Sequence, residues 1–373
     1  MALPSVGRGL GATVASTASV LSAYFVAYAV VLLPAGALVD RYGARRLALT
    51  GLGVFAIGAG AGALADNFTL LVATRVIQGV GAGLVSPAAL AAAVSGFPAE
   101  RRGSALGIWG ASAGVANLVG PLLGGILTVA FGWRAAWWAL VPMALAAAWG
   151  IERQVPKSLH GEKAEGRQPL VNPMVLTATL VAALTFAVMI GSFFLAEQYL
   201  QRAAGFSALG ASAALILVAV LVGLGAPLAG RLVDQQGERL PALLGFAGTA
   251  LGLAVLGIPD VPLHSVVTIL PLVPVGLGLG MLFVPTSRAA LNATPVAFHG
   301  RTSAVLSVGR LLGAAVGGAL GGVALSGGAR ASTVHEALLV AAGVCVLVGL
   351  PASLRLNSRT PLLTGVRAPR EAA

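Results

Sequence analysis

The chain has 373 residues, of which 57% are hydrophobic and only 9% are charged, and its mean hydropathy is +0.92. A soluble domain carries about 25% charged residues, so this composition excludes an ordinary soluble globular protein. The formal net charge of +11 does not indicate a nucleic-acid partner, because most basic residues lie in short segments between long apolar runs.

Eleven apolar runs, most of them about as long as a bilayer is thick, follow one another along the chain. We expect helices, because a helix satisfies its own backbone hydrogen bonds in lipid. The predicted spans are 19–39, 45–65, 68–96, 102–130, 134–150, 173–197, 209–233, 239–257, 265–287, 302–326 and 334–353. The sequence therefore predicts an all-α polytopic membrane protein.

A polar and charged segment at 151–172 separates the first five predicted spans from the last six. We interpret it as a cytoplasmic linker between an N-terminal helical half at 1–150 and a C-terminal half at 173–354. The remaining residues, 355–373, form the predicted cytoplasmic tail.

The basic residues predict the orientation in the membrane. When the 40–46 turn is placed in the cytoplasm, 17 of the 23 Lys and Arg residues fall in inside segments, 4 in outside segments and 2 within spans. This is the positive-inside pattern of membrane proteins. It predicts a multi-pass protein of the plasma membrane whose C-terminus is cytoplasmic.

A charged phrase occurs twice, as GALVDRYGAR at 36–45 and as GRLVDQQGER at 230–239. Three alternating glycines at 79–83 likewise match three at 276–280, at nearly the same offset. Both turns fall on the same side, so we expect two halves related by an axis along the membrane normal, with a site between them near the midplane. The first-half partner of span 173–197 would lie before Met1, and we therefore expect the first half to lack its first helix.

We expect the repeated turn to act as a latch between the two halves. Glycine permits the tight turn, and a carboxylate favours a nearby helix N-terminus. The alternative is a solvated turn that only determines topology. The predicted latch residues are Gly36, Asp40, Arg41, Gly43, Arg45, Asp234, Gly237 and Arg239.

Several segments together resemble the major facilitator superfamily, and the resemblance covers most of the chain. GALVDRYGARR (36–46) resembles its loop signature between the second and third helices, and LVATRVIQGVGAG (71–83) resembles its fourth-helix motif. GPLLGG (120–125) is similar to the antiporter motif of drug:proton exchangers, and WRAAWWALVP (133–142) to the multidrug branch. One departure is that the acidic residue of the family's first helix would lie upstream of this chain.

The resemblance implies a two-half helical bundle of the major facilitator type, with twelve helices minus the first. It implies a monomer that exports small, drug-like organic molecules by proton-coupled alternating access within the lipid bilayer. Two alternatives stay open: metabolite uptake by the same fold, and a truncated membrane protein that does not transport.

Charged and amide side chains within apolar spans are the candidates for proton or substrate translocation. A charge at a helix centre costs about 2.5–3.5 kcal/mol on insertion scales, so its presence favours function. The alternatives are a structural, hydrogen-bonding arginine at Arg75 and a solvated helix end at Glu197. Arg75 is the clearest case, and Gln78 lies one turn further on the same helix face. The full candidate set is Arg75, Gln78, Asn117, Glu197 and Arg310.

The segment that resembles the antiporter motif contains two Gly-x-x-x-Gly spacings, which let neighbouring helices approach closely, and one proline that can bend a helix. The residues are Gly110, Gly114, Gly120, Pro121, Gly124 and Gly125. Ordinary tight packing is the alternative to a role specific to exchange.

Nothing in the sequence predicts an enzyme, a cofactor or a metal site. It has no phosphate-binding loop of the G-x-x-x-x-G-K-[ST] type, its four histidines are scattered, and Cys345 is its only cysteine. The expected partners are a small-molecule substrate, protons and the bilayer, and no nucleic acid is expected.

Overall fold

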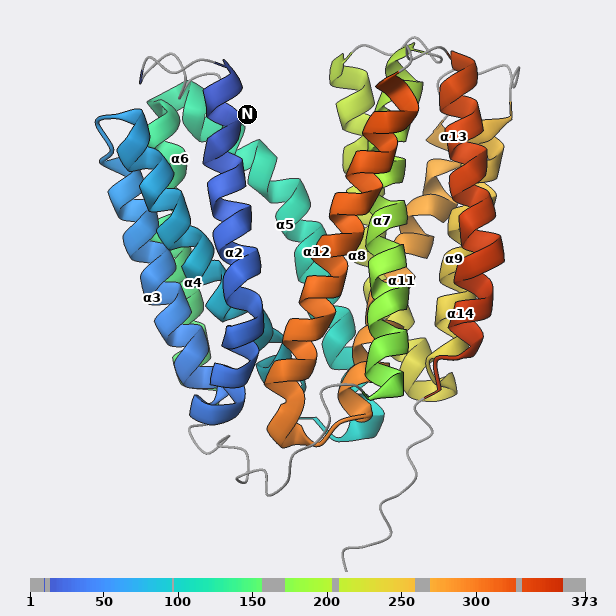
Figure 1. Ribbon diagram of the computed structural model, residues 1–373, viewed down its shortest axis with the longest axis horizontal. Helices are drawn as coiled ribbons and strands as arrows, with labels where there is room; N and C mark the ends of the chain where they lie inside the picture. The colour runs from blue at the N-terminus through green and yellow to red at the C-terminus, as the bar shows by residue number, and fades with distance from the viewer. Residues whose placement is uncertain are drawn as a thin grey trace, which may run out of the picture.

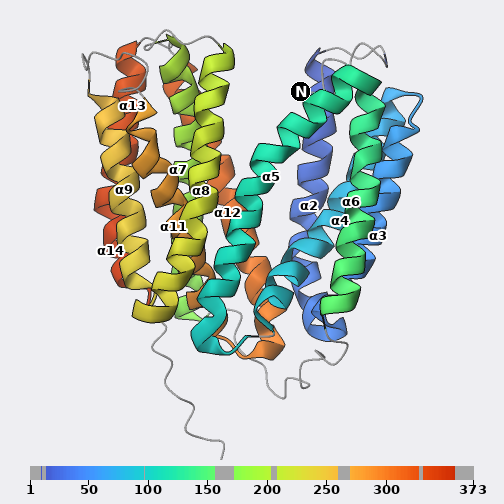
Figure 2. The ribbon, with the colours of Figure 1, turned by 180° about the vertical axis from the view of Figure 1, so that it is seen from behind.

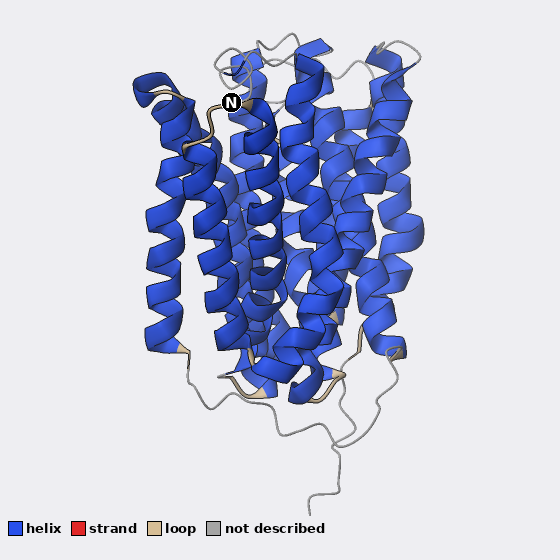
Figure 3. Ribbon diagram, turned by 60° about the vertical axis from the view of Figure 1, so that its left-hand side comes forward, coloured by secondary structure: helices blue, strands red, loops and turns tan. Residues whose placement is uncertain are grey.

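The computed structural model describes residue 10 and residues 14–95, 97–155, 172–202, 208–258, 269–326 and 331–357. Throughout these residues the regular structure is helical, and Figure 3 shows no strand among them. The predicted linker and tail fall mostly outside the described residues, at 156–171 and 358–373.

The N-terminal half consists of five long helices in the described residues. They are α2 (Val14–Tyr42), α3 (Ala44–Ala63), α4 (Phe68–Ser95), α5 (Arg102–Phe131) and α6 (Trp133–Gln154), with the short 3₁₀ helix η1 (Ala99–Arg101) before α5. The C-terminal half contains α7 (Pro173–Arg202), α8 (Ala208–Gln236), α9 (Arg239–Gly257), α11 (Leu272–Asn292), η2 (Val296–Phe298), α12 (His299–Ser326), α13 (Ala331–Val344), the π-helical turn η3 (Cys345–Gly349) and α14 (Leu350–Leu354).

The all-α polytopic fold predicted from the apolar runs is confirmed. Ten helical segments of the described residues are long and apolar enough to cross a membrane. They correspond to ten of the eleven predicted spans, and the eleventh is the 30-residue α5. The helices mostly extend beyond the apolar runs: α2 continues past Asp40, α6 continues to Gln154, and α7 ends at Arg202 rather than near Glu197.

The repeated glycines pack the two halves in the same way. In α4, the first and third glycines of 79–83 lie against α2 and the second lies against α3. In α11, the first and third glycines of 276–280 lie against α8 and the second lies against α9. At all six positions an added Cβ would come within 3.0 Å of a neighbouring atom, so the sequence repeat corresponds to a repeat of helix packing.

The two halves meet at one end of the bundle and diverge toward the other (Figures 1 and 2). At the end where they meet, which we call the latch end, α2 lies beside α12 and α5 lies beside α8. We call the opposite end the open end. The helix before the predicted linker, α6, ends at the latch end, and the helix after it, α7, begins there. Most of the other predicted cytoplasmic segments also lie at the latch end.

Candidate functional site

Each copy of the repeated phrase ends a long helix with a glycine in a left-handed conformation. Gly43 follows α2 with a φ of 86°, and Gly237 follows α8 with a φ of 81°. Residues other than glycine rarely adopt backbone conformations with such a positive φ. The turns are therefore very tight, and each leaves an aspartate in the last turn of the preceding helix.

Asp40 caps the first turn of α12, a helix of the opposite half. Its Oδ1 accepts the backbone N–H of Gly300 at 2.8 Å, and its Oδ2 accepts that of Arg301 at 3.3 Å. The Arg301 guanidinium lies 3.3 Å from Oδ2. Gly36 allows this approach, because an added Cβ there would lie 2.8 Å from the Gly300 carbonyl oxygen.

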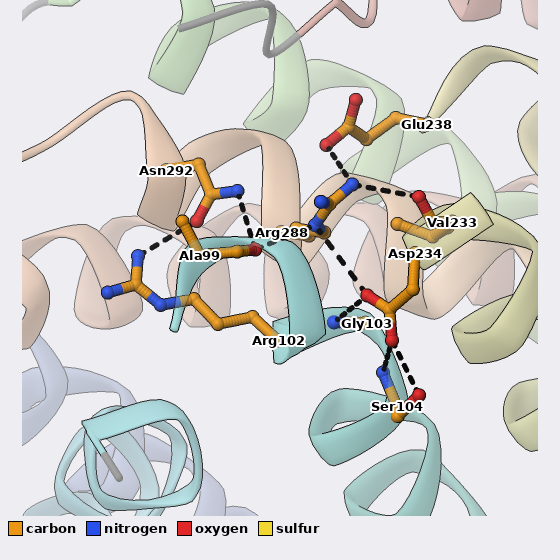
Figure 4. A network of polar contacts seen from close by, with 9 residues as sticks. All are labelled: Ala99, Arg102, Gly103, Ser104, Val233, Asp234, Glu238, Arg288 and Asn292. Carbon is orange, nitrogen blue, oxygen red and sulfur yellow. Dashed lines mark hydrogen bonds and ion pairs between the residues drawn. The ribbon is translucent and has the colours of Figure 1, made fainter. Parts of the chain in front are cut away.

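Asp234 makes the equivalent contact in the other direction and caps α5. Its Oδ1 accepts the backbone N–H of Gly103 at 2.8 Å, and its Oδ2 accepts that of Ser104 at 2.8 Å as well as the Ser104 hydroxyl (Figure 4). A carboxylate at a helix N-terminus interacts favourably with the free N–H groups and the helix dipole. Both halves therefore hold each other through the same kind of contact at the same end.

Arg288 of α11 is a further latch residue that the sequence did not single out. Its Nη1 donates to Glu238 Oε1 at 3.1 Å and to the Val233 carbonyl at 2.9 Å, and its Nε lies 4.0 Å from Asp234 Oδ1. Nε also donates to the carbonyl of Ala99 in the other half, at 3.3 Å (Figure 4). The only sequence signal for it was a lone arginine at the end of an apolar run.

A second polar pair joins the halves next to Arg288. Arg102 of α5 donates from Nη1 to Asn292 Oδ1 of α11 at 2.8 Å, and Asn292 donates to the Ala99 carbonyl at 3.3 Å (Figure 4). We call the set of contacts made by Asp40, Asp234, Arg288 and Arg102 the latch.

The three predicted latch arginines, Arg41, Arg45 and Arg239, form no hydrogen bond or ion pair with the opposite half in the described structure. Arg41 is exposed and lies over the Tyr42 ring. Arg45 pairs with Glu152 of α6 at 3.3 Å, which ties α3 to α6 within the first half. Arg239 is exposed at the start of α9. The crossing interactions run through carboxylates and helix N-termini instead.

Arg75 is held inside the N-terminal half. Its Nη1 donates to Gln78 Oε1 at 2.8 Å, and its Nε donates to the Val20 carbonyl at 3.3 Å. Its Cζ lies 5.4 Å from the ring centroid of Tyr24 and 5.1 Å from that of Trp137. Arg75 and Gln78, which the sequence places one turn apart on the same helix face, are thus hydrogen-bonded to each other, and their role in translocation stays a prediction.

Arg310 lies at the junction of the halves and is 6% exposed. Its Nη2 donates to Ser287 Oγ of α11 at 2.7 Å, and its Cζ lies 4.1 Å over the Phe283 ring. Phe283 in turn stacks on Trp109 of α5, with ring centroids 4.9 Å apart. Tyr28 of α2 is near enough to Arg310 to interact with it electrostatically. We call Tyr28, Trp109, Phe283, Ser287 and Arg310 the central cluster.

The glycines of the predicted antiporter motif differ from one another. Gly110 is buried and lies against Ala226 and Phe283 of the other half. In contrast, an added Cβ at Gly120, Gly124 or Gly125 would have nothing within 4 Å. The close helix approach expected at those three positions is therefore not seen in this conformation. The structure does not describe the surroundings of four further candidate residues: Gly114, Asn117, Pro121 and Glu197.

No group of three or more His, Cys, Asp or Glu side chains gathers into a possible metal site in the described part of the chain. Its ion pairs, apart from Arg45–Glu152, belong to the latch. The described structure thus contains two features: the latch, which joins the two halves, and the central cluster, in which Arg310 lies among aromatic side chains.

A family model described as Major Facilitator Superfamily matches residues 1–318. The chain belongs to the major facilitator superfamily. Solved structures of that superfamily have the same fold. The structure of XylE, a proton:xylose symporter, aligns with a TM-score of 0.72 and 18% identity over 94% of this chain and 89% of that one. The human organic anion transporter MFSD10 aligns with a TM-score of 0.75 and 17% identity over 90% and 83%.

Curated relatives of this superfamily member include export and resistance proteins. The multidrug resistance protein Stp of Mycobacterium tuberculosis is 27% identical over 87% of this chain and 72% of its own length. A triacylglyceride transporter of Mycobacteroides abscessus is 30% identical over 86% and 76%. An uncharacterized transporter of M. tuberculosis, Rv1250, is 46% identical, but over only 38% of this chain and 25% of its own length.

Proposed function

We propose that this superfamily member exports small organic molecules in exchange for protons, by alternating access between its two halves. The observation that carries the proposal is the pair of reciprocal caps at one end of the bundle, Asp40 on α12 and Asp234 on α5. Each cap bridges the two halves by a few polar contacts, so both can be broken and remade as the halves rock around a central site.

The latch closes one end of the transporter in this conformation. Opening that end requires the N-terminal turns of α5 and α12 to leave their aspartates. Water can then solvate the carboxylates and the free N–H groups, which keeps the cost of opening small. We infer that the latch end is cytoplasmic, because the loops there carry most of the basic residues, and that the protein acts as a monomer in the plasma membrane.

Export is favoured over uptake by the names of the relatives. Stp and the tetracenomycin C resistance and export protein of Streptomyces glaucescens, which is 26% identical over 86% of this chain, are named for resistance or export. The similarity of this chain to the symporter XylE, at 18% identity, is evidence for the fold alone. Uptake of a metabolite remains the alternative within the same mechanism, and a membrane protein that does not transport is the alternative outside it.

Transport into inverted membrane vesicles tests this proposal. The probes are two xanthene dyes of opposite charge, fluorescein and rhodamine 123, and the vesicle lumen is acidified. A proton-coupled exporter accumulates at least one dye, and a protonophore abolishes the accumulation. Gradient-driven dye loss from preloaded vesicles would instead support symport and uptake. Dye fluxes that equal those of vesicles without the protein would contradict transport of these probes.

We also infer that the first half has room for one more helix, which would complete the family's twelve. In the second half, α7 packs on the glycines of α12, with Ala183 and Ala187 backbone atoms against Gly313 and Gly317. At the repeat offset of 197, Gly120 of α5 corresponds to Gly317 and faces open space. The intact mass and the N-terminal peptide of the protein from its native host test this. A mass larger than 37.0 kDa by about one helix supports the additional helix, and a native chain that begins at Met1 refutes it.

A further inference from the structure

Arg310 is a buried cation without a matching anion in the described structure. Among the described side chains, no carboxylate forms an ion pair with it, and its Nε has no hydrogen-bond partner. Its neutral contacts are the Ser287 hydroxyl, which satisfies one N–H group, and the rings of Phe283 and Phe186, whose centroids lie 4.1 and 5.8 Å from its Cζ. A charge this deep in a membrane protein is normally paired or placed in a substrate pathway.

Arg75, which is partly buried, adds a second positive charge inside the helical bundle. Arg75 also lacks an ion pair among the described residues, and a stack of two tyrosines leads from it toward Arg310. Tyr24 lies under Arg75, and its ring stacks on that of Tyr28 at 6.2 Å between centroids. Two guanidiniums without described counter-charges attract an anion and repel a cation.

The cover over Arg310 is shared between the two halves. Phe283 comes from α11 and Trp109 from α5, so their stack spans the junction. It lies just beyond the latch, where Gly107 and Gly110 of α5 still pack against Ala226 and Pro227 of α8. Separation of the halves at the latch end would therefore pull Trp109 away from Phe283 and free Phe283 to uncover the guanidinium.

We propose that the transported molecule is an organic anion with an apolar, aromatic body, and that Arg310 binds its carboxylate when the latch end is open. This proposal rests on the export function proposed above. A guanidinium donates two parallel hydrogen bonds to a carboxylate, and aromatic rings at its side accept the apolar body. Closing of the latch end returns Phe283 over Arg310 and displaces the anion toward the open end.

Equilibrium binding to the full chain in lipid nanodiscs tests the proposal without any gradient. Fluorescein and rhodamine 123 share the xanthene ring system, but the first is an anion and the second a cation. We expect saturable binding of fluorescein that is tighter than that of rhodamine 123. In R310Q the affinity for fluorescein should fall at least about tenfold, as expected for loss of a buried charge partner, while R310K should retain part of it.

The control variant is R134Q, which removes an exposed positive charge at the open end and should bind fluorescein like the wild type. If R310Q proves unstable, the comparison of the two dyes on the wild type still decides. No saturable fluorescein binding, tighter binding of rhodamine 123, or equal fluorescein affinity in R310Q and wild type would each overturn the proposal.

The outcome separates the two proposals. Gradient-driven transport of rhodamine 123 without fluorescein binding would leave the exporter and remove the anion site. Fluorescein binding that depends on Arg310, without gradient-driven transport of either dye, would leave the site and count against proton-coupled export.

Discussion

The variant Asp40→Asn tests the latch most directly, because it changes charge with little change in shape. Asn keeps one acceptor oxygen for the Gly300 N–H but loses the charge. The bond to the Arg301 N–H is lost or weakened, and a hydrogen bond to a charged group contributes about 1.5–3 kcal/mol against about 0.5–1.5 kcal/mol for a neutral one. The favourable interaction with the α12 dipole, about 0.3–1 kcal/mol, is also reduced.

The ion pair with Arg301 adds little to this total. The Arg301 side chain is 44% exposed, and exposed pairs contribute about 0–1 kcal/mol. We therefore expect Asp40→Asn to destabilise the latch-closed conformation by about 2 kcal/mol, which is a shift of about 30-fold in the equilibrium between the two conformations.

Spin-label distances across the latch end measure that shift. The exposed positions Arg46 and Gln235 are changed to cysteine and labelled, while the native Cys345 is buried. Double electron–electron resonance should show a longer distance that gains population in Asp40→Asn, and dye efflux should slow. Asp66→Asn, which alters an exposed carboxylate at the open end, is the control. An unchanged distance distribution together with unchanged efflux would refute the latch.

The remaining predictions concern the same contacts. Asp234→Asn should shift the equilibrium in the same direction as Asp40→Asn, measured with the same spin labels. Gly43→Ala forces a φ near 86° on a residue with a Cβ and should lower the unfolding free energy by about 1–3 kcal/mol, seen as a lower thermal midpoint in detergent. Gly317→Ala should be destabilising by about 1–3 kcal/mol, because its Cβ would overlap backbone atoms of Ala187. Gly120→Ala should be neutral or stabilising in this chain, because its Cβ meets open space and alanine favours a helix. Equal thermal midpoints for Gly317→Ala and Gly120→Ala would contradict the helix packing described above.

The sequence predicted the helices and the repeat because both are local or periodic signals. The apolar runs matched the helices to within a few residues at most boundaries. The largest difference was at the start of α11, predicted at 265 and found at Leu272, where the residues before 269 are outside the described structure. Helix ends such as that of α2 were predicted too early, because the charged last turn contains Asp40 yet remains helical.

The partners across the halves were not predictable. Asp40 and Gly300 are 260 residues apart, and no periodicity links them. The sequence did indicate that a carboxylate would favour a helix N-terminus, but not which helix. Arg288 was missed as a latch residue for a similar reason, since its role comes from Glu238, Val233 and Ala99, which three separate segments bring together.

The two arms of the latch are unequal, and the inequality follows from the repeat itself. At the repeat offsets, Arg288 corresponds to Ala91 and Glu238 corresponds to Ala44, so only the second half has the buried arginine–glutamate pair beside its aspartate. Asp40 instead meets Arg301, which water reaches. That pair lies within the second half, but it holds Arg288 where its Nε donates across the halves to the Ala99 carbonyl, beside the Arg102–Asn292–Ala99 contacts. Among the described residues, the α2–α12 arm has no such additional contacts around Asp40 except the exposed Arg301 pair, which contributes about 0–1 kcal/mol. The arm between α2 and α12 should therefore yield first when the latch end opens. Arg310 of the central cluster also lies on α12. Release of the α2–α12 arm would therefore let α12 move together with this arginine.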